Sequence, residues 1–109
     1  MTTVNIFRSE GKIVGFEALG HAMAGEAGND IVCSAVSALT QTALMGIIGY
    51  LKLECAYEVA EAEVYCMLSN DVADKDVEKA EIIFETMAMG LKSIAENYKE
   101  NLKVIEKEV

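Results

Sequence analysis

The sequence contains no proline and no tryptophan, a single histidine and three cysteines. Cys33, Cys55 and Cys66 stand 22 and 11 residues apart, so they form neither an even-numbered disulfide framework nor a CxxC pair. One histidine with three widely spaced cysteines matches no recognised zinc pattern, and we expect no metal and no other cofactor. The odd cysteine count favours a reducing compartment, which predicts a cytoplasmic protein.

Positive charge is also scarce. Nine Lys and Arg residues face eighteen Asp and Glu residues, which gives a formal net charge of -9 and a sequence pI near 4.5. Because the basic residues are scattered, no basic patch is available for a phosphate backbone, and we expect no direct nucleic-acid binding. The surface favours a basic protein or peptide as partner. An acidic surface that only keeps the protein soluble is the simpler alternative.

Long apolar runs and linkers are missing as well. The N-terminus lacks the basic region and apolar core of a signal peptide. Gln41, Lys52 and Glu54 interrupt the longest apolar stretches, so we expect no membrane span and no membrane partner. With 109 residues and no repeat or low-complexity segment, the chain is predicted to be a single domain covering 1–109.

The N-terminal half shows strand and then helix patterns. Apolar residues alternate along 2–8, a second β-rich run covers 13–19, and turn residues lie between them, which predicts a β-hairpin. Apolar residues then recur at three- and four-residue steps, which predicts a core helix from Asn29 or Asp30 to about Tyr50.

The C-terminal half is interpreted as a second hairpin and a helix. The stretch 51–68 alternates like a strand but lacks Gly or Pro at a turn near Ala60-Glu61. Apolar residues then repeat every seven positions, which predicts one helix from Asp74 to about Glu106. The predicted fold is therefore α+β of order ββαββα, with two β-hairpins forming an antiparallel sheet, a central helix and a long C-terminal helix.

The last predicted helix is too long for the domain. From Asp74 to Glu106 it would extend roughly 50 Å at 1.5 Å per residue. Its end stays apolar through Tyr98, Leu102 and Ile105. Either this end frays or it packs against a second copy of the chain, and we expect a homodimer.

The candidate chemistry lies where a glycine-containing loop meets the central helix. If Asp30 is the N-cap, Cys33 lies in the first turn, where unpaired backbone N–H groups favour a thiolate. His21 is the only imidazole available as a general base. Asp30 would either cap the helix or orient His21. A cysteine buried for packing is the alternative for Cys33, and it is the interpretation for Cys55 and Cys66.

Three glycines surround His21 along the chain. Gly20, Gly25 and Gly28 permit backbone conformations closed to other residues, as a substrate-gripping loop or a mobile lid requires. A plain flexible connection is an equal alternative. No strand leads into a GxGxxG or GK[ST] element, so the glycines do not form a phosphate cradle.

At these residues the chain resembles the ribosomal-processing cysteine protease family of bacteria. The matching residues are Gly20-His21-Ala22 and the segment 28–37, GNDIVCSAVS, while Ala24 stands where family members often carry an aromatic residue. The resemblance implies a cytoplasmic, homodimeric α+β protease with Cys33 as nucleophile and His21 as base. We expect Gly20, Gly25, Gly28 and Ser34, which lie in or beside the matching segments, to contact the substrate.

The family's known task is to remove a short N-terminal extension from a large-subunit ribosomal protein, the twenty-seventh in bacterial numbering, cutting after an aromatic residue. A basic extension would be attracted to an acidic enzyme. Two other interpretations stay open at this stage: a non-catalytic ribosome-assembly or interaction module, and a thiol redox sensor.

Overall fold

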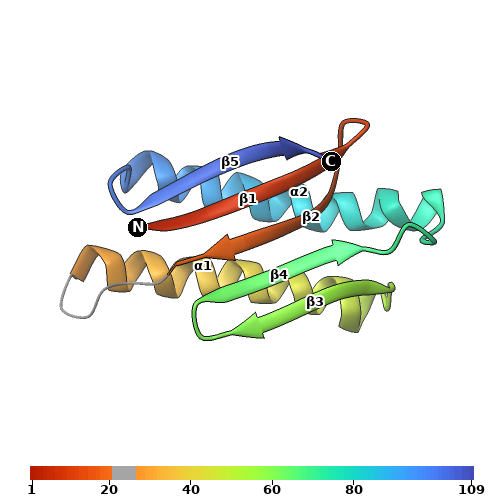
Figure 1. Ribbon diagram of the computed structural model, residues 1–109, viewed down its shortest axis with the longest axis horizontal. Coiled ribbons are helices and arrows are strands. Elements are labelled where there is room, and N and C mark those ends of the chain that lie inside the picture. Colours follow the sequence, from red (N-terminus) through yellow and green to blue (C-terminus); the bar gives the residue numbers. More distant parts are fainter. Residues whose placement is uncertain (21–26) are drawn as a thin grey trace.

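A computed structural model describes residues 1–20 and 27–109, which form one sheet with two helices packed against one of its faces (Figure 1). The strands are β1 (Thr2–Ser9), β2 (Lys12–Leu19), β3 (Cys55–Ala60), β4 (Glu63–Leu68) and β5 (Leu102–Glu108). The helices are α1 (Ala27–Met45), which continues into the π-helical turn η1 (Gly46–Tyr50), and α2 (Asp74–Asn97). The α+β class expected from the sequence is confirmed.

The five strands lie in the order β3-β4-β2-β1-β5. All neighbouring strands are antiparallel except β1 and β5, which are parallel. Both predicted hairpins are present. However, β3 begins only at Cys55, because the chain at Leu51 still belongs to the end of the helix: the Leu51 amide donates to the Gly46 carbonyl at 2.9 Å, and Lys52 has a φ of 54°.

The prediction of one helix from Asp74 to Glu106 is wrong. α2 ends at Asn97, and the chain returns as β5 alongside β1. The apolar residues at the end of the chain fit a strand as well as a helix, and the open edge of β1 decides between them. Leu102 pairs with Thr2 and becomes buried in the core. The element order is therefore ββαββαβ, and the sheet is mixed.

This correction removes the reason for which a dimer was expected. At 24 residues α2 is about 36 Å long, which fits within the 44 Å long axis of the molecule. No helix tail is left without support. The homodimer stays a prediction.

The prediction that α1 begins at Asn29 or Asp30 is also wrong, because the helix begins at Ala27. Asp30 is thus its fourth residue and not its N-cap. The apolar periodicity of the sequence starts only near Ile31, so it did not predict the helical turn that precedes this residue. Ala27 has high helix propensity, and an acidic residue in the first turn is favoured by the helix dipole without capping.

The core lies between the sheet and the helix layer. Phe16 of β2 and Phe84 of α2 are fully buried and meet edge to face, with ring centroids 6.1 Å apart. The helices approach each other closely at glycines: a Cβ on Gly46 would come within 2.8 Å of the Ile83 side chain. The sheet face opposite the helices carries more polar side chains, as period-two alternation predicts.

One helical stretch, Ile31–Tyr50, has 20 residues and a mean hydropathy of 1.8, so by length and composition it could cross a membrane. The expectation that Gln41 would interrupt it was wrong, because glutamine is uncharged and the first charged side chain after Asp30 is Lys52. The core helix of a globular protein passes the same test. Val32, Val36 and Ile47 of this stretch are buried against the sheet and α2.

Phe84→Ala should lower the free energy of unfolding by about 3–5 kcal/mol, because it removes a fully buried ring and leaves a cavity beside Phe16. Urea denaturation followed by circular dichroism measures the change. Ser93→Ala, at an exposed position of the same helix, should stay within about 0.5 kcal/mol of the wild type. A loss below about 1 kcal/mol for Phe84→Ala would contradict the described core.

Candidate active site

Cys33 lies on α1 where the helix passes beneath the ends of β2 and β4. Its side chain is partly exposed and lines a small cavity of about 20 Å³, enough for about one water molecule. The cavity is shared by the helix, the end of β2 and the β3–β4 turn, and its lining residues are Thr2, Ala18, Gly20, Cys33, Val36, Ser37, Thr40, Ala60, Glu61, Ala62, Glu63 and Val64. The thiol therefore sits at the border between core and solvent.

Gly20 lines the same cavity and has a backbone that requires glycine. Its φ is 87°, and its amide donates to the Ala62 carbonyl at 3.1 Å, which joins the end of β2 to the β3–β4 turn. A Cβ at this position would come within 2.7 Å of the Met1 carbonyl oxygen. The conformational freedom expected of this glycine is thus used in the fold, and its contact with substrate stays a prediction.

The expectation that Cys33 lies in the first helical turn is wrong. Because α1 begins at Ala27, Cys33 is the seventh helical residue, about 9 Å along the axis from the helix start. The field of unpaired N–H groups falls off within the first turn. The helix start is therefore too distant to stabilise a thiolate or an oxyanion at Cys33.

The remaining predicted site residues are only partly covered by the structure. His21 and Gly25 lie outside the described residues, and for Gly28 and Asp30 only the backbone, in the first turn of α1, is described. Ser34 is exposed and does not line the cavity of Cys33. The structure thus brings together Cys33 and Gly20 from the predicted set.

The other two cysteines lie on neighbouring strands. Cys55 of β3 pairs with Leu68, and Cys66 of β4 pairs with Tyr57, so the two thiols are diagonal neighbours. Burial raises the pKa of the Cys66 thiol far above its ordinary value, and its contacts with Cys55 raise it further. Burial also raises the pKa of the Cys55 thiol, although a hydrogen bond with Cys66 partly offsets this. Both cysteines favour the unreactive thiol.

Sequence reasoning missed several residues around Cys33. Thr40 is fully buried seven residues further along α1, and its hydroxyl donates to the Val36 carbonyl at 2.7 Å. The helical spacing could have predicted that Thr40 lies near Cys33, because Cys33, Val36 and Thr40 share one face of the helix. The glutamates of the β3–β4 turn, Glu61 and Glu63, had no such signal, because only the tertiary fold brings that turn to α1.

The described residues contain no cluster of three or more His, Cys, Asp or Glu side chains that could hold a metal ion. Among these residues, the cavity is lined by the thiol of Cys33 together with hydroxyl-bearing and carboxylate-bearing residues.

Comparisons with known proteins bear on this thiol. A family model described as Cysteine protease Prp matches residues 1–103. The Ribosomal processing cysteine protease Prp of Bacillus subtilis (strain 168) is 32% identical over 107 residues, which cover 95% of this chain and 96% of the relative.

Two solved structures have a similar fold. The structure of the ribosomal processing protease Prp from S. aureus with a substrate peptide has a TM-score of 0.83 and 30% identity, covering 98% of this chain and 100% of that one. A structure of the S. aureus protease with a covalently linked product peptide has a TM-score of 0.80 and 31% identity at the same coverage.

Cys33 should react with iodoacetamide at neutral pH at least about tenfold faster than Cys55 or Cys66, because burial raises the pKa of the other two thiols. Mass spectrometry of the folded protein after timed labelling measures the three rates. In denaturing urea the rates should become similar, which is the control. Equal labelling of Cys33 and Cys55 in the folded state would remove the basis for choosing Cys33.

Proposed function

The chain belongs to the cysteine protease Prp family and is a cysteine protease, and we propose that it removes a short N-terminal extension from a large-subunit ribosomal protein, the twenty-seventh in bacterial numbering. Cys33 is the nucleophile in this proposal and His21 the general base. Asp30 orients His21, and the glycines around His21 together with Ser34 contact the substrate. The protein acts in the cytoplasm, where ribosomal proteins are made.

One observation carries the assignment of the nucleophile. Cys33 lines the described cavity at the helix–sheet border, which neither Cys55 nor Cys66 does, and this cavity lies beside the strand end that leads to the single histidine of the sequence. Gly20, which directly precedes His21 in the sequence, lines that same cavity. Cys66 is fully buried, and burial suppresses ionisation of Cys55.

The proposed reaction proceeds in two steps. His21 accepts the proton of the Cys33 thiol, and Sγ attacks the carbonyl carbon of the scissile peptide bond. The C–N bond then breaks, the leaving amine takes the proton from His21, and the N-terminal fragment remains on Sγ as a thioester. Water activated by His21 hydrolyses this thioester and restores the thiol. The covalently linked product peptide in the S. aureus relative supports a covalent step of this kind.

The charge of the chain supports a basic substrate. With a net charge of -9 the protein attracts the basic segments of a free ribosomal protein and repels ribosomal RNA. Cleavage before assembly into the ribosome follows from this, and so does the absence of direct nucleic-acid binding.

Cys33→Ala and His21→Ala should each lower the rate of cleavage of an extended substrate, His21→Ala by about 10²–10⁴-fold and Cys33→Ala to background. Steady-state kinetics on a synthetic peptide that spans the cleavage site measures the loss. Thermal unfolding should shift by no more than a few degrees, about what 1 kcal/mol produces in a domain of this size.

Cys66→Ala is the matched control, because it removes a thiol that is buried away from the cavity of Cys33 and should keep kcat. A His21→Ala protein that cleaves at nearly the wild-type rate would exclude His21 as the base.

We also propose that the protein is a homodimer formed through its helix layer. The outer faces of α1 and α2 expose large apolar side chains, among them Ile82 and Met89 at 69% and 72% exposure. Between the helices lies an apolar groove of about 450 Å³, lined by Leu39 and Ile83 among others. Only 33% of the apolar stretch Ile31–Tyr50 is buried within one chain. A self-complementary contact of two such layers would cover this surface.

Ile82→Glu with Met89→Glu should convert the dimer into a monomer of 11.8 kDa, because charged side chains would be buried in the contact. Sedimentation equilibrium measures the mass. Lys103→Glu, an exposed charge change on the opposite face of the sheet, should leave the mass at twice that value. A double variant that remains dimeric would place the contact elsewhere.

A further inference from the structure

Within residues 1–20 and 27–109, the strand β3 has an edge without a strand partner. In the sheet order β3-β4-β2-β1-β5, β3 pairs only with β4. The Ser69 amide donates to the Glu54 carbonyl at 3.0 Å, so residues 54 and 69 form a hydrogen-bonded pair at the start of this ladder. Antiparallel ladders alternate, which directs the N–H and C=O groups of Cys55, Tyr57 and Val59 to the free side. This edge can accept one more strand.

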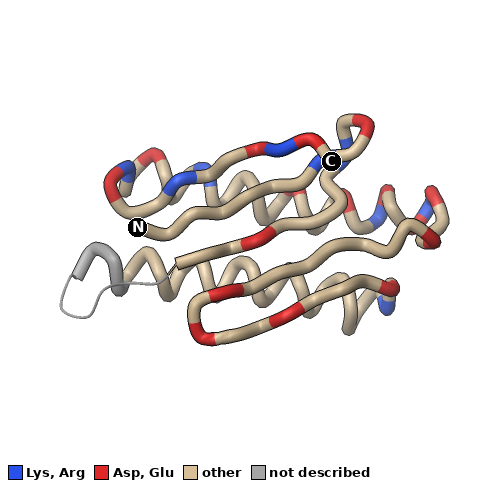
Figure 2. The backbone as a smooth tube through the Cα atoms, viewed as in Figure 1, with Lys and Arg blue, Asp and Glu red and all other residues tan. Residues whose placement is uncertain are grey.

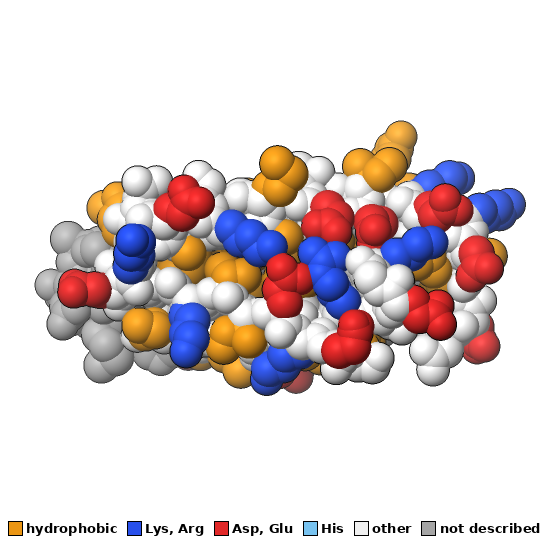
Figure 3. Space-filling model, turned by 90° about the horizontal axis from the view of Figure 1, so that it is seen from above, with side chains coloured by type: hydrophobic (Ala, Val, Ile, Leu, Met, Phe, Trp, Pro, Cys, Tyr) orange, Lys and Arg blue, Asp and Glu red, His pale blue; other side chains and the backbone are white. Residues whose placement is uncertain are grey.

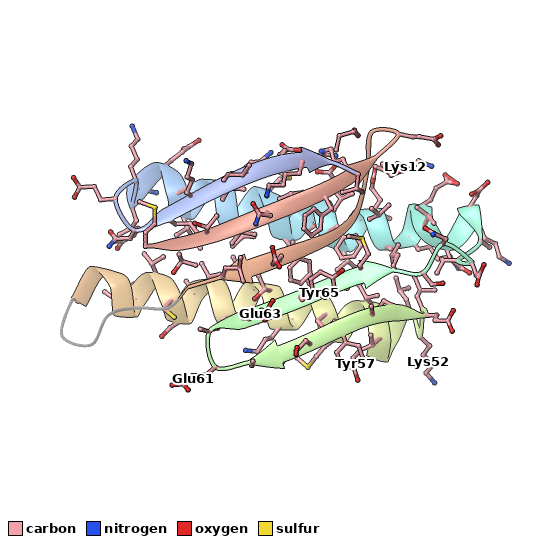
Figure 4. The ribbon with its side chains drawn as sticks, in the orientation of Figure 1. Lys12, Lys52, Tyr57, Glu61, Glu63 and Tyr65 are labelled. Carbon is pink, nitrogen blue, oxygen red and sulfur yellow. The ribbon has the colours of Figure 1, made fainter. Side chains whose placement is uncertain are left out.

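The side chains along this edge favour an extended peptide. Tyr57 and Val59 are 55% and 49% exposed although both share a sheet face with buried residues of β4. In Figure 4 the ring of Tyr57 extends past β3 on its free side. An added strand would cover these apolar side chains and pair with the backbone between them, as in peptide recognition by strand addition.

The charge around the edge is of one sign. The segment 53–74 contains Glu54, Glu58, Glu61 and Glu63 along the hairpin and no Lys or Arg. In Figure 2 the charged residues on β3, β4 and their turn are all acidic. The nearest cation along the chain, Lys52, lies at the end of β3 farthest from the β3–β4 turn (Figure 4). The edge therefore favours a basic segment.

The other outer strand, β5, differs in this respect. Figure 3 looks onto that side of the molecule and shows positive and negative side chains interspersed. Glu106 of β5 forms ion pairs with Arg8 and with Lys92, and these partners lower the pKa of the Glu106 carboxyl. Because Glu106 is paired within the chain and β5 also carries Lys103 and Lys107, this edge has less electrostatic attraction for a basic peptide.

The free edge of β3 leads to the proposed nucleophile. β3 ends at Ala60, and residues 60–64, which span the β3–β4 turn and the start of β4, line the cavity of Cys33. The strand has six residues and is about 20 Å long at 3.3 Å per residue. A substrate peptide paired along β3 therefore reaches the cavity after about six residues. Its paired segment lies within about six residues of a peptide bond placed at Cys33.

We propose that the free edge of β3 binds the substrate as an added β-strand, with an extended basic segment next to the scissile bond pairing with Cys55, Tyr57 and Val59. This inference rests on the proposed protease function and identifies its substrate-docking surface. The backbone pairing gives affinity without demanding a particular sequence, and the glutamates of the hairpin select for positive charge.

The direct test probes the backbone of the substrate. A peptide of about 16 residues spanning the cleavage site covers β3 on either side of the bond. One backbone N–H at a time is replaced by N-methyl, and binding to the Cys33→Ala protein is measured by fluorescence anisotropy. On one side of the bond every second N-methyl group within about six residues should weaken binding about three- to tenfold, and the intervening ones should have little effect.

Two sets of variants test the enzyme side. Val59→Pro removes an N–H that faces the free side and leaves the β4 ladder paired, so KM should rise about tenfold with a smaller change in kcat. Glu61→Lys with Glu63→Lys should raise KM and weaken its dependence on salt, because the attraction for the basic segment is reversed. Glu100→Lys with Glu108→Lys makes the same charge change on the β5 side and should leave KM near the wild-type value.

The outcomes separate this proposal from the protease function. If the wild type does not cleave the peptide, the proposed function fails, whereas the N-methyl scan still reports on docking. Cleavage without a period-two pattern in the scan overturns the β3 edge as the docking surface. If Val59→Pro dissociates a dimer and leaves KM unchanged, the edge is occupied by a second copy of the chain, which overturns it as well.

Discussion

The parallel pairing of β1 with β5 holds the first and last strands of the chain together, and the rest of the fold depends on it. β1 is hydrogen-bonded on both sides, to β2 and to β5, and Val4 and Ile6 become fully buried. For β5 to run parallel to β1, α2 must carry the chain back across one face of the sheet. This return brings Phe84 onto Phe16 and completes the core.

The same constraint positions the proposed nucleophile. α1 is fixed to the sheet by a buried row that includes Val32, Val36 and Thr40. Cys33 lies at the border of this row, about 100° around the helix from Val32 but close to the direction of Thr40, and its side chain is partly exposed. The Gly20–Ala62 hydrogen bond ties the end of β2 to the β3–β4 turn beside it. A rigid scaffold thus presents a thiol at its border, next to the strand end that leads to His21.

The two outer strands of the sheet differ in how their acidic residues are compensated. On the β5 side, Arg8 and Lys92 neutralise Glu106, while the glutamates of the β3–β4 hairpin have no cation within their own segment. An evenly acidic sequence thereby becomes a molecule with one attractive edge for a basic peptide. That edge ends at the cavity of Cys33, so the proposed docking strand and the proposed nucleophile lie on adjacent parts of the surface.

Local patterns in the sequence determined much of this protein. Period-two alternation predicted both hairpins, three- and four-residue steps predicted α1, and a seven-residue repeat predicted the start of α2, because these patterns depend only on which side of an element is buried. The short segment around His21 and Cys33 identified the candidate chemistry before any contact was known.

Only the tertiary structure decided that Leu102 and Ile105 belong to a strand. Their spacing suits a helix or a strand, and the open edge of β1 that pairs with them lies about a hundred residues earlier in the chain. It also decided that Thr2, Gly20 and Glu61 meet at Cys33. Such contacts arise from packing between distant segments, which no local pattern records.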